Sequence, residues 1–327
     1  MEECLNPILA FKTGRLTSKG KEQYYLDLGH QAINYELPVK FYMRFDYDPL
    51  NPVICRHDDF THMDYLTKYV KVPCGKCIAC QCNKAIDLAT RLYLESTLHN
   101  FYYFVTLTYS PEYYSRQRDF KRDFQKFMKR LRKKLGSDNP IRFFSTFEHG
   151  ETFGRGHFHA IIYFDKPIDD NLTFYKMNGK NILYVSSLMS SLWPYGYNTV
   201  GTSNDSIAAL CYVSKYCVKK AGFDDDGFYL FSRRPGLGAG AVKDIEENYI
   251  LVNDGKTVSK RRLPSYVYDK LETEKPALYE AIKDLKRDFI NHAYNFPKPE
   301  TDKILNQSYV REEKLKQFLI DKFTKIC

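Results

Sequence analysis

Apolar residues recur with two different periods along the middle of the chain. Between 116 and 135 the apolar residues at helical spacing are Phe120, Phe124, Phe127, Met128, Leu131 and Leu135. This spacing predicts an amphipathic helix with one apolar stripe. Aromatic and β-branched residues dominate 103–109, 141–148 and 157–164, which predicts three strands. The polar, glycine-containing segment 149–156 predicts a hairpin loop between the last two strands.

Weaker patterns outline the rest of the chain. Further helices are expected at about 83–99, 182–193 and 206–220, with a short strand at 198–201. Residues 1–70 have an irregular pattern with weak strand signals at 39–45, and 270–326 indicate two helices broken by Phe296-Pro297-Lys298-Pro299. The expected class is α+β, with a central antiparallel sheet flanked by helices. The expected divisions are an N-terminal cysteine-containing region (1–99), a core (100–240) and a helical extension (241–327).

The composition excludes several classes of protein. The chain has 327 residues, a mean hydropathy of −0.49 and 16% aromatic residues, including 27 Tyr and 23 Phe. So many aromatic residues argue against intrinsic disorder. Apolar runs are much shorter than the ~18 residues that a membrane span needs, so no membrane partner is expected. Acidic residues follow Met1 where a signal peptide would be basic, so secretion is not expected.

The net charge of +9 is almost entirely local. Residues 116–134 contain ten basic and two acidic residues, whereas the rest of the chain is nearly neutral. This run is either an ordinary solvated helix face or a helix that contacts nucleic-acid phosphates. The candidate DNA-binding residues are Lys121, Arg122, Lys126, Lys129, Arg130, Lys133, Arg233 and Arg234.

His157 and His159 are two residues apart in a predicted strand, so their imidazoles project from the same face. If 141–148 and 157–164 form a hairpin, Glu148 lies across from His157, and one carboxylate and two imidazoles converge. Such a mixed set suits Mg²⁺ or Mn²⁺ at a phosphate. The alternative is a pair of polar strand residues with an ordinary cross-strand partner.

Tyr212 and Tyr216 are four residues apart in a predicted helix, and Lys215 and Lys219 flank them. The spacing alone is uninformative, since Tyr65 and Tyr69 share it. The lysines change the picture, because a phenol is a weak nucleophile that needs a nearby cation.

Four of the nine cysteines lie between 74 and 82. The spacing Cys74-x-x-Cys77-x-x-Cys80 favours a thiolate metal site, most simply structural Zn²⁺ with four ligands. Cys4, Cys55 or Cys82 could complete it, and Cys4 lies in a short Cys-Leu-Asn-Pro segment. Reduced thiols without metal and an iron–sulfur cluster are the alternatives.

Several motifs occur together in a fixed order. They are Pro73-Cys74-Gly75-Lys76-Cys77-x-x-Cys80, Phe104-Val105-Thr106-Leu107-Thr108-Tyr109, Gly156-His157-Phe158-His159-Ala160-Ile161-Ile162, Leu192-Trp193-Pro194-x-Gly196, Tyr212-Val213-Ser214-Lys215-Tyr216-x-x-Lys219-Lys220 and Ser232-Arg233-Arg234-Pro235-Gly236-Leu237-Gly238. This ordered set resembles the replication initiators of gokushovirus-type Microviridae, which are HUH endonucleases of the two-tyrosine rolling-circle class. The resemblance covers about 74–240.

The resemblance implies an HUH-type core with a ferredoxin-like or RRM-like antiparallel sheet. By this similarity His157, His159 and Glu148 are metal ligands, and Tyr212 and Tyr216 are nucleophiles, with Lys215 and Lys219 beside them. The implied activity is nicking and rejoining of single-stranded origin DNA in the cytoplasm of a host bacterium, together with the host polymerase and helicase. The alternatives are a non-catalytic, zinc-stabilised protein that binds single-stranded nucleic acid, and another HUH enzyme such as a transposase or relaxase.

Overall fold

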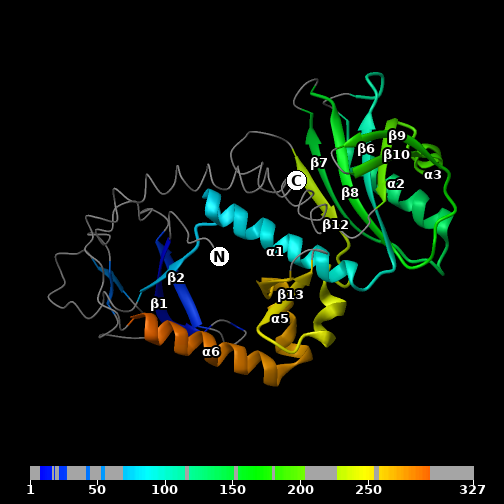
Figure 1. Cartoon of the computed structure of the whole chain (residues 1–327). Coiled ribbons are helices and arrows are strands. Elements are labelled where there is room, and N and C mark those ends of the chain that lie inside the picture. Colours follow the sequence, from blue (N-terminus) through cyan, green and yellow to red (C-terminus); the bar gives the residue numbers. More distant parts are fainter. Residues whose placement is uncertain are drawn as a thin grey trace. The chain divides into compact units, whose positions relative to one another are not determined.

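The structure, a computed structural model, describes residues 8–16, 18, 22–27, 42–44, 53–55, 69–114, 118–150, 154–178, 181–202, 227–253 and 258–294. The chain forms two compact units (Figure 1). One comprises Met1–Asn83 and Phe296–Lys322, and the other comprises Lys84–Asn295 and Phe323–Cys327. Within the described ranges, no helix combines the length and the apolar character that crossing a membrane requires. The domain boundaries expected from the sequence stay predictions.

The first unit contains strands that the sequence pattern did not predict. β1 (Ile8–Leu16) lies between β2 (Glu22–Asp27) and β5 (Tyr69–Val72) in an antiparallel sheet. The expectation that 1–70 is irregular is therefore wrong for these segments. β1 begins with the apolar run Ile-Leu-Ala-Phe and continues with polar residues, so it lacks the alternation by which a half-buried strand is recognised. The weak signal at 39–45 is confirmed by β3 (Tyr42–Arg44), which pairs with β4 (Val53–Cys55).

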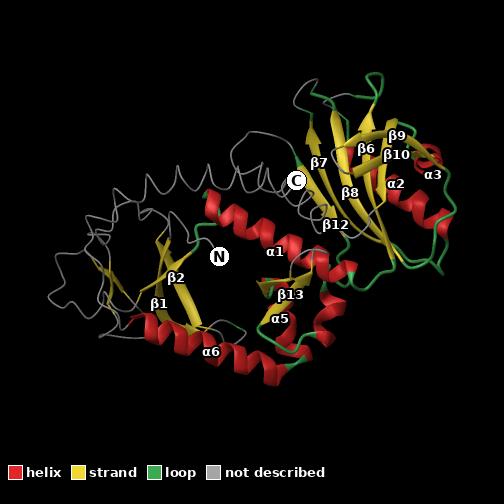
Figure 2. Ribbon diagram, in the orientation of Figure 1, coloured by secondary structure: helices red, strands yellow, loops and turns green. Residues whose placement is uncertain are grey.

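The second unit is built on a seven-stranded antiparallel sheet of order β12-β7-β8-β6-β11-β10-β9 (Figure 2). The strands are β6 (Phe101–Tyr109), β7 (Arg142–His149), β8 (Gly156–Phe164), β9 (Leu172–Asn178), β10 (Asn181–Ser186), β11 (Gly196–Thr202) and β12 (Phe228–Phe231). The α+β class, the three strong strands and the hairpin are confirmed. β8 lies between β7 and β6, so its backbone is hydrogen-bonded on both sides.

The basic helix, α2 (Phe120–Leu135), packs on one face of this sheet. The side chain of Asp119 caps the helix by accepting a hydrogen bond from the Arg122 amide, and Gly136 follows the last turn. Phe124 and Phe127 are fully buried and share a core with Phe158 and Ile162 of β8. α3 (Ser187–Leu192) contributes to the same core. The apolar stripe predicted from the sequence is therefore the surface by which α2 holds this face.

The opposite face of the sheet has a separate core. Ile161 and Tyr163 of β8 are buried there with Phe144 of β7 and with Leu92 of α1 (Ile78–Ser96). Even-numbered residues of β8 thus face α2, and odd-numbered residues face the other side, as the period of a strand requires. The helix expected at 83–99 is confirmed by α1.

The segment 182–193 is only half helical, so the helix predicted for all of it is wrong. Its first half is β10, which pairs with β9, and only Ser187–Leu192 forms a helix. The Oγ of Ser186 accepts a hydrogen bond from the Met189 amide and so fixes the start of α3. Tyr184 and Val185 favour a strand, and pairing with β9 decides their conformation.

The C-terminal part of this unit adds short elements and two helices. They are the 3₁₀ helix η3 (Ala239–Asp244), the hairpin β13 (Tyr249–Asn253) and β14 (Val258–Arg262), and the helices α5 (Ser265–Glu274) and α6 (Pro276–Tyr294). Of the two helices expected in 270–326, the first corresponds mainly to α6, and the second lies outside the described residues. The helix expected at 206–220 also lies outside them.

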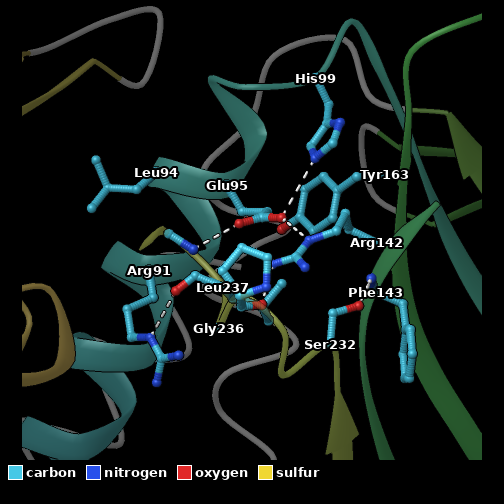
Figure 3. Close-up of polar contacts among 12 residues, drawn as sticks. Arg91, Leu94, Glu95, His99, Arg142, Phe143, Tyr163, Ser232, Gly236 and Leu237 are labelled. Carbon is cyan, nitrogen blue, oxygen red and sulfur yellow. Dashed lines mark hydrogen bonds and ion pairs between the residues drawn. The ribbon is translucent and has the colours of Figure 1, made fainter. Parts of the chain in front are cut away.

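A buried carboxylate holds the loop after β12 (Figure 3). Glu95 of α1 is only 2% exposed and accepts hydrogen bonds from Arg142 Nε at 2.6 Å and from the Gly238 amide at 2.7 Å. Arg142 of β7 also donates to the carbonyl of Pro235 at 2.8 Å. We call residues 232–238 the arginine loop, because they include two arginines. One carboxylate therefore joins α1, the sheet and the arginine loop.

His99 extends this network. Its Nε2 lies 3.4 Å from Glu95 Oε1, its Nδ1 lies 2.8 Å from Asp165 Oδ1, and its ring stacks on Tyr163. Burial opposes the charge of both groups, but hydrogen bonds from His99 and Arg142 lower the pKa of Glu95. For His99, hydrogen bonds to Glu95 and Asp165 outweigh burial and raise the pKa. Each charge therefore stabilises the other.

We expect Glu95→Gln to lower the free energy of unfolding by about 3 kcal/mol, because Arg142 would keep its buried position without a charged partner. Urea denaturation followed by circular dichroism measures this change. The control is Glu280→Gln, which breaks the exposed pair with Lys283 and should have a much smaller effect. Equal losses in the two variants would contradict a structural role for the buried carboxylate.

The contribution of His99 should depend on pH. Because its pKa is raised above 6.5 in the folded chain, its stabilising charge is fully present below pH 6.5 and disappears as the pH rises through the folded value. The stability difference between the wild type and His99→Phe should therefore shrink between pH 6 and pH 9. Denaturation midpoints measured across this range test the expectation, and a constant difference would refute it.

Candidate functional site

The hairpin of β7 and β8 aligns the three residues that the sequence singled out as ligands. Glu148 lies directly opposite His157, as expected from the sequence, and Thr146 lies opposite His159. On the other side of β8, Thr106 of β6 also lies opposite His159. Directly opposed residues in antiparallel strands project from the same face. The carboxylate and both imidazoles therefore share the sheet face opposite α2.

The three side chains meet at one point. Glu148 Oε1 lies 2.9 Å from His157 Nε2 and 3.2 Å from His159 Nε2. One ligand atom from each residue lies within 4.8 Å of the other two. The side chains are between 13% and 17% exposed, so the cluster is accessible from one side only.

The electrostatics of the cluster favour an ionised carboxylate. Partial burial would raise the pKa of Glu148, but hydrogen bonds from His157 and His159 outweigh it and lower the pKa to about 2. Glu148 is therefore negatively charged throughout the physiological range and attracts a cation to this point.

The other ring nitrogen of each histidine is already used. Nδ1 of His159 lies 3.1 Å from Thr106 Oγ1, and Nδ1 of His157 lies 3.2 Å from the carbonyl oxygen of Arg155. A proton on Nδ1 of His157, donated to that carbonyl, leaves the Nε2 lone pair directed at the cluster. Metal-binding histidines are typically oriented in this way by a partner on the second nitrogen.

The donor set fits a small divalent cation. Neighbouring ligands of an octahedral ion at ~2.1 Å are about 3 Å apart, which agrees with the two separations from Glu148 Oε1. The hydroxyl of Thr146, beside His159, is buried and has no hydrogen-bond partner among the described residues. Buried hydroxyls normally have one, and the water shell of a bound ion would provide it. The cluster can thus hold a metal ion.

Gly156 allows the two strands to approach at the cluster. A Cβ atom at this position would lie 2.7 Å from Cζ of Phe147, which is fully buried. A larger residue would displace this ring from the core or push β8 away from β7. The glycine before His157 therefore has a packing reason.

The basic helix lies on the other face of the sheet from this cluster, since its core partners Phe158 and Ile162 alternate with His157 and His159. The sequence prediction did not distinguish the faces. Lys121, Arg122, Lys126, Lys129 and Lys133 are exposed, as are Arg233 and Arg234 of the arginine loop. Arg130 differs from them, because it is half-buried and donates from Nε to the carbonyl of Leu192 at the end of α3.

In the first unit, Cys74, Cys77 and Cys80 bring their sulfur atoms within 4.8 Å of one another. The Sγ atoms of Cys74 and Cys80 are 4.0 Å apart, close to the ~3.8 Å expected for two thiolates on a tetrahedral Zn²⁺. The Cys77 amide donates to Cys74 Sγ at 3.3 Å, and Gly75 makes the intervening turn with φ of 73°. These residues can hold a metal ion, as the sequence spacing indicated.

The structure disfavours one candidate for a fourth thiolate. Cys80 and Cys82 both lie in α1, two residues and therefore about 200° apart around the helix axis. Cys82 is fully buried and cannot join the cluster while Cys80 does. Cys4 lies outside the described residues, and the structure does not describe the side chain of Cys55.

Tyr212, Tyr216, Lys215 and Lys219 also lie outside the described residues, so their roles stay predictions. Thr106 and Thr146 are the site residues that sequence reasoning missed. Thr106 occurs in one of the recognised motifs, but its contact with His159 depends on the register of β6 against β8. The sequence contains no direct signal for that register.

Comparison with known proteins identifies related chains. Residues 102–221 match a family model that describes the replication-associated protein ORF2. The chain is 29% identical over 234 residues to replication-associated protein VP4 of Bdellovibrio phage phiMH2K, covering 65% of this chain and 72% of the relative. It is 27% identical over 240 residues to replication-associated protein ORF2 of Spiroplasma virus 4, covering 66% and 73% respectively.

A third relative, replication-associated protein ORF4 of Chlamydia phage 1, is 29% identical over 170 residues, which are 50% of this chain and 42% of the relative. No solved structure matches the chain at a significant level. These comparisons confirm the resemblance to Microviridae-type replication initiators that the ordered motifs indicated.

We expect His159→Ala to weaken Mn²⁺ binding at least tenfold, because it removes one ligand and leaves Glu148 and His157. Titration of the full chain with Mn²⁺, followed by electron paramagnetic resonance, measures the free ion. His149→Ala is the matched control, since His149 lies in the same hairpin and packs against Phe120 and Tyr114 on the α2 face. Equal affinities in the two variants would exclude the cluster as the binding site.

Cys74→Ser should lower the bound zinc by about one ion per chain, because a thiolate ligand is lost. Elemental analysis of purified protein after removal of loosely bound metal measures the stoichiometry. The buried Cys82→Ser variant serves as the control and should retain its zinc. Unchanged zinc in Cys74→Ser would refute the thiolate site.

Proposed function

We propose that the chain is a phage replication initiator that nicks single-stranded origin DNA and later rejoins the strand. The observation that carries this proposal is the convergence of Glu148, His157 and His159 within a region that matches a replication-associated family model. The names of the three relatives support a role in phage replication. The cluster supports phosphoryl-transfer chemistry, because it is an accessible, oxygen- and nitrogen-rich site with an ionised carboxylate.

In the proposed reaction, the phenolic oxygen of Tyr212 or Tyr216 attacks the scissile phosphorus. The bond between phosphorus and the 3′ oxygen breaks as the new bond forms, which gives a 5′-phosphotyrosine and a free 3′-hydroxyl group. Mg²⁺ or Mn²⁺ bound by Glu148, His157 and His159 would supply Lewis-acid polarisation of the scissile phosphate. Lys215 and Lys219 stabilise the phenolate and the charge that develops on the phosphate oxygens.

Two tyrosines on one helix would allow two transfers without dissociation. After the host polymerase has extended the 3′-hydroxyl group, the second tyrosine attacks the regenerated junction. The released 3′-hydroxyl group then attacks the first phosphotyrosine and closes a single-stranded circle. Because the host polymerase and helicase are needed for this cycle, the proposed compartment is the cytoplasm of the host bacterium.

The double variant Tyr212→Phe with Tyr216→Phe should form no covalent adduct, since phenylalanine lacks the attacking oxygen. Labelled single-stranded origin DNA is incubated with the full chain and Mn²⁺, and adducts that resist SDS are separated by electrophoresis. The matched control is Tyr65→Phe with Tyr69→Phe, which has the same spacing and should retain the adduct. An adduct in the first double variant would overturn the assignment of the nucleophiles.

A further inference from the structure

A groove of about 290 Å³ lies between α2 and the edge strand β12, apart from the metal cluster. Its lining includes the cations Lys121, Arg132 and Arg233 and the apolar side chains of Phe143, Leu230 and Phe231. We call it the α2–β12 groove. Its volume is at the lower end of the range for small-ligand pockets and suits one nucleotide unit. Among the described residues that line it, none is acidic.

The basic residues of α2 are not equivalent with respect to this groove. Lys121 and Arg132 are eleven residues apart and therefore only about 20° apart around the helix axis. Both line the groove. Arg122 and Lys133 have the same separation but lie about 100° away around the axis, on an exposed stripe outside the groove. The tertiary structure thus divides the charge run into a groove stripe and an outer stripe.

The cations of the groove lie against aromatic rings. The guanidinium of Arg132 lies 5.6 Å from the ring centre of Phe143, and that of Arg233 lies 5.6 Å from the ring centre of Phe231. Burial lowers the pKa of Arg132, and no carboxylate of the described residues opposes this effect. Cations beside aromatic rings, in a groove that the described acidic residues do not line, are the arrangement by which proteins hold a phosphate and a stacked base of single-stranded DNA.

The floor of the groove is fixed before any ligand binds. The Phe143 amide donates to Ser232 Oγ at 3.1 Å, and the Ser232 amide donates to the Phe143 carbonyl at 2.9 Å. Figure 3 shows this contact beside the Glu95 and Arg142 network that holds the arginine loop. Arg233 therefore projects from a segment that is anchored on both sides, and little conformational entropy is lost when it binds an anion.

The groove and the metal cluster share strand β7. Phe143 lies at the groove and Glu148 at the cluster, five residues or about 17 Å apart along the strand. A strand of a few nucleotides spans this distance. It would pass from the face that carries the cluster, over the edge strand β12, to the face that carries α2.

We propose that the α2–β12 groove binds one nucleotide of the single-stranded DNA substrate, a few nucleotides away from the scissile phosphate. Lys121, Arg132 and Arg233 contact the phosphate, and the base packs against Phe143 and Phe231. This inference rests on the proposed function, because it takes single-stranded DNA as the substrate. It adds a binding subsite on the sheet face opposite the metal cluster.

The test measures binding of fluorescein-labelled oligothymidylate to the full chain in EDTA, where no cleavage occurs, by fluorescence anisotropy over a range of salt concentrations. Lys121→Ala with Arg132→Ala should raise the Kd at least tenfold at 100 mM NaCl. The slope of log K against log salt should fall by about 1.4, if each cation contacts one phosphate. Arg233→Ala alone should reduce the slope by about 0.7.

The matched controls remove the same charges outside the groove. Arg122→Ala with Lys133→Ala removes one arginine and one lysine at the same separation, and Arg234→Ala alters the neighbouring residue of the arginine loop. Both should change the Kd less than about threefold. Equal losses in groove and control variants would overturn the proposal, because they would indicate only a general attraction to a basic surface. If the wild type binds no oligonucleotide even at low salt, the proposed function fails together with the groove.

A measurement on the wild type avoids any effect of substitution on folding. Oligothymidylate that contains one 5-iodouracil is cross-linked to the full chain by ultraviolet light, and the modified peptide is identified by mass spectrometry. We expect adducts on Phe143 or Phe231, since this base cross-links to aromatic rings on which it stacks. Adducts confined to peptides that do not line the groove would overturn the proposal while leaving single-strand binding intact.

Discussion

The pleat of the central strand β8 is the constraint on which the rest of the second unit depends. Residues 158, 160, 162 and 164 are buried against α2, and residues 161 and 163 are buried on the opposite face. Both hydrophobic cores therefore fix the same register. A slip of one residue would put the histidines into the α2 core and expose Phe158. Packing that has nothing to do with chemistry thus holds His157 and His159 opposite Glu148.

The same alternation separates the metal cluster from the basic helix. A site that attracts a cation through an ionised carboxylate would be poorly placed beside a row of lysines and arginines, because like charges compete for the same space. With the sheet between them, each surface keeps its own electrostatic character. Nucleic acid that contacts both surfaces would have to cross an edge of the sheet. β12 is the edge strand next to β7, and the arginine loop follows it directly.

Rigid supports recur around both surfaces. Thr106 and the Arg155 carbonyl orient the two histidine rings, while Glu95 and Arg142 hold the arginine loop. These partners are hydrogen-bonded to elements of regular structure or to segments next to them. Side chains held in this way need little reorganisation when a ligand arrives, which favours binding and charge stabilisation alike.

The amino-acid sequence by itself determined the local features of this protein. Helical spacing identified α2, and strand composition identified β6, β7 and β8. The ligand pattern of Glu148, His157 and His159 followed from assuming one hairpin, because cross-strand neighbours in a hairpin are set by its register. The cysteine spacing likewise indicated three residues that do converge. In each case the interaction is between residues close in sequence, or across one turn.

Only the tertiary structure decided what each face meets. Periodicity shows which side of α2 is apolar, but not that Arg130 contacts α3 or that Arg132 lines a groove with Arg233. It missed the sheet of the first unit and half of segment 182–193, where pairing with a distant or later strand overrides local preference. These outcomes depend on contacts between segments far apart along the chain, and the free energy of such contacts is not encoded in any single window of residues.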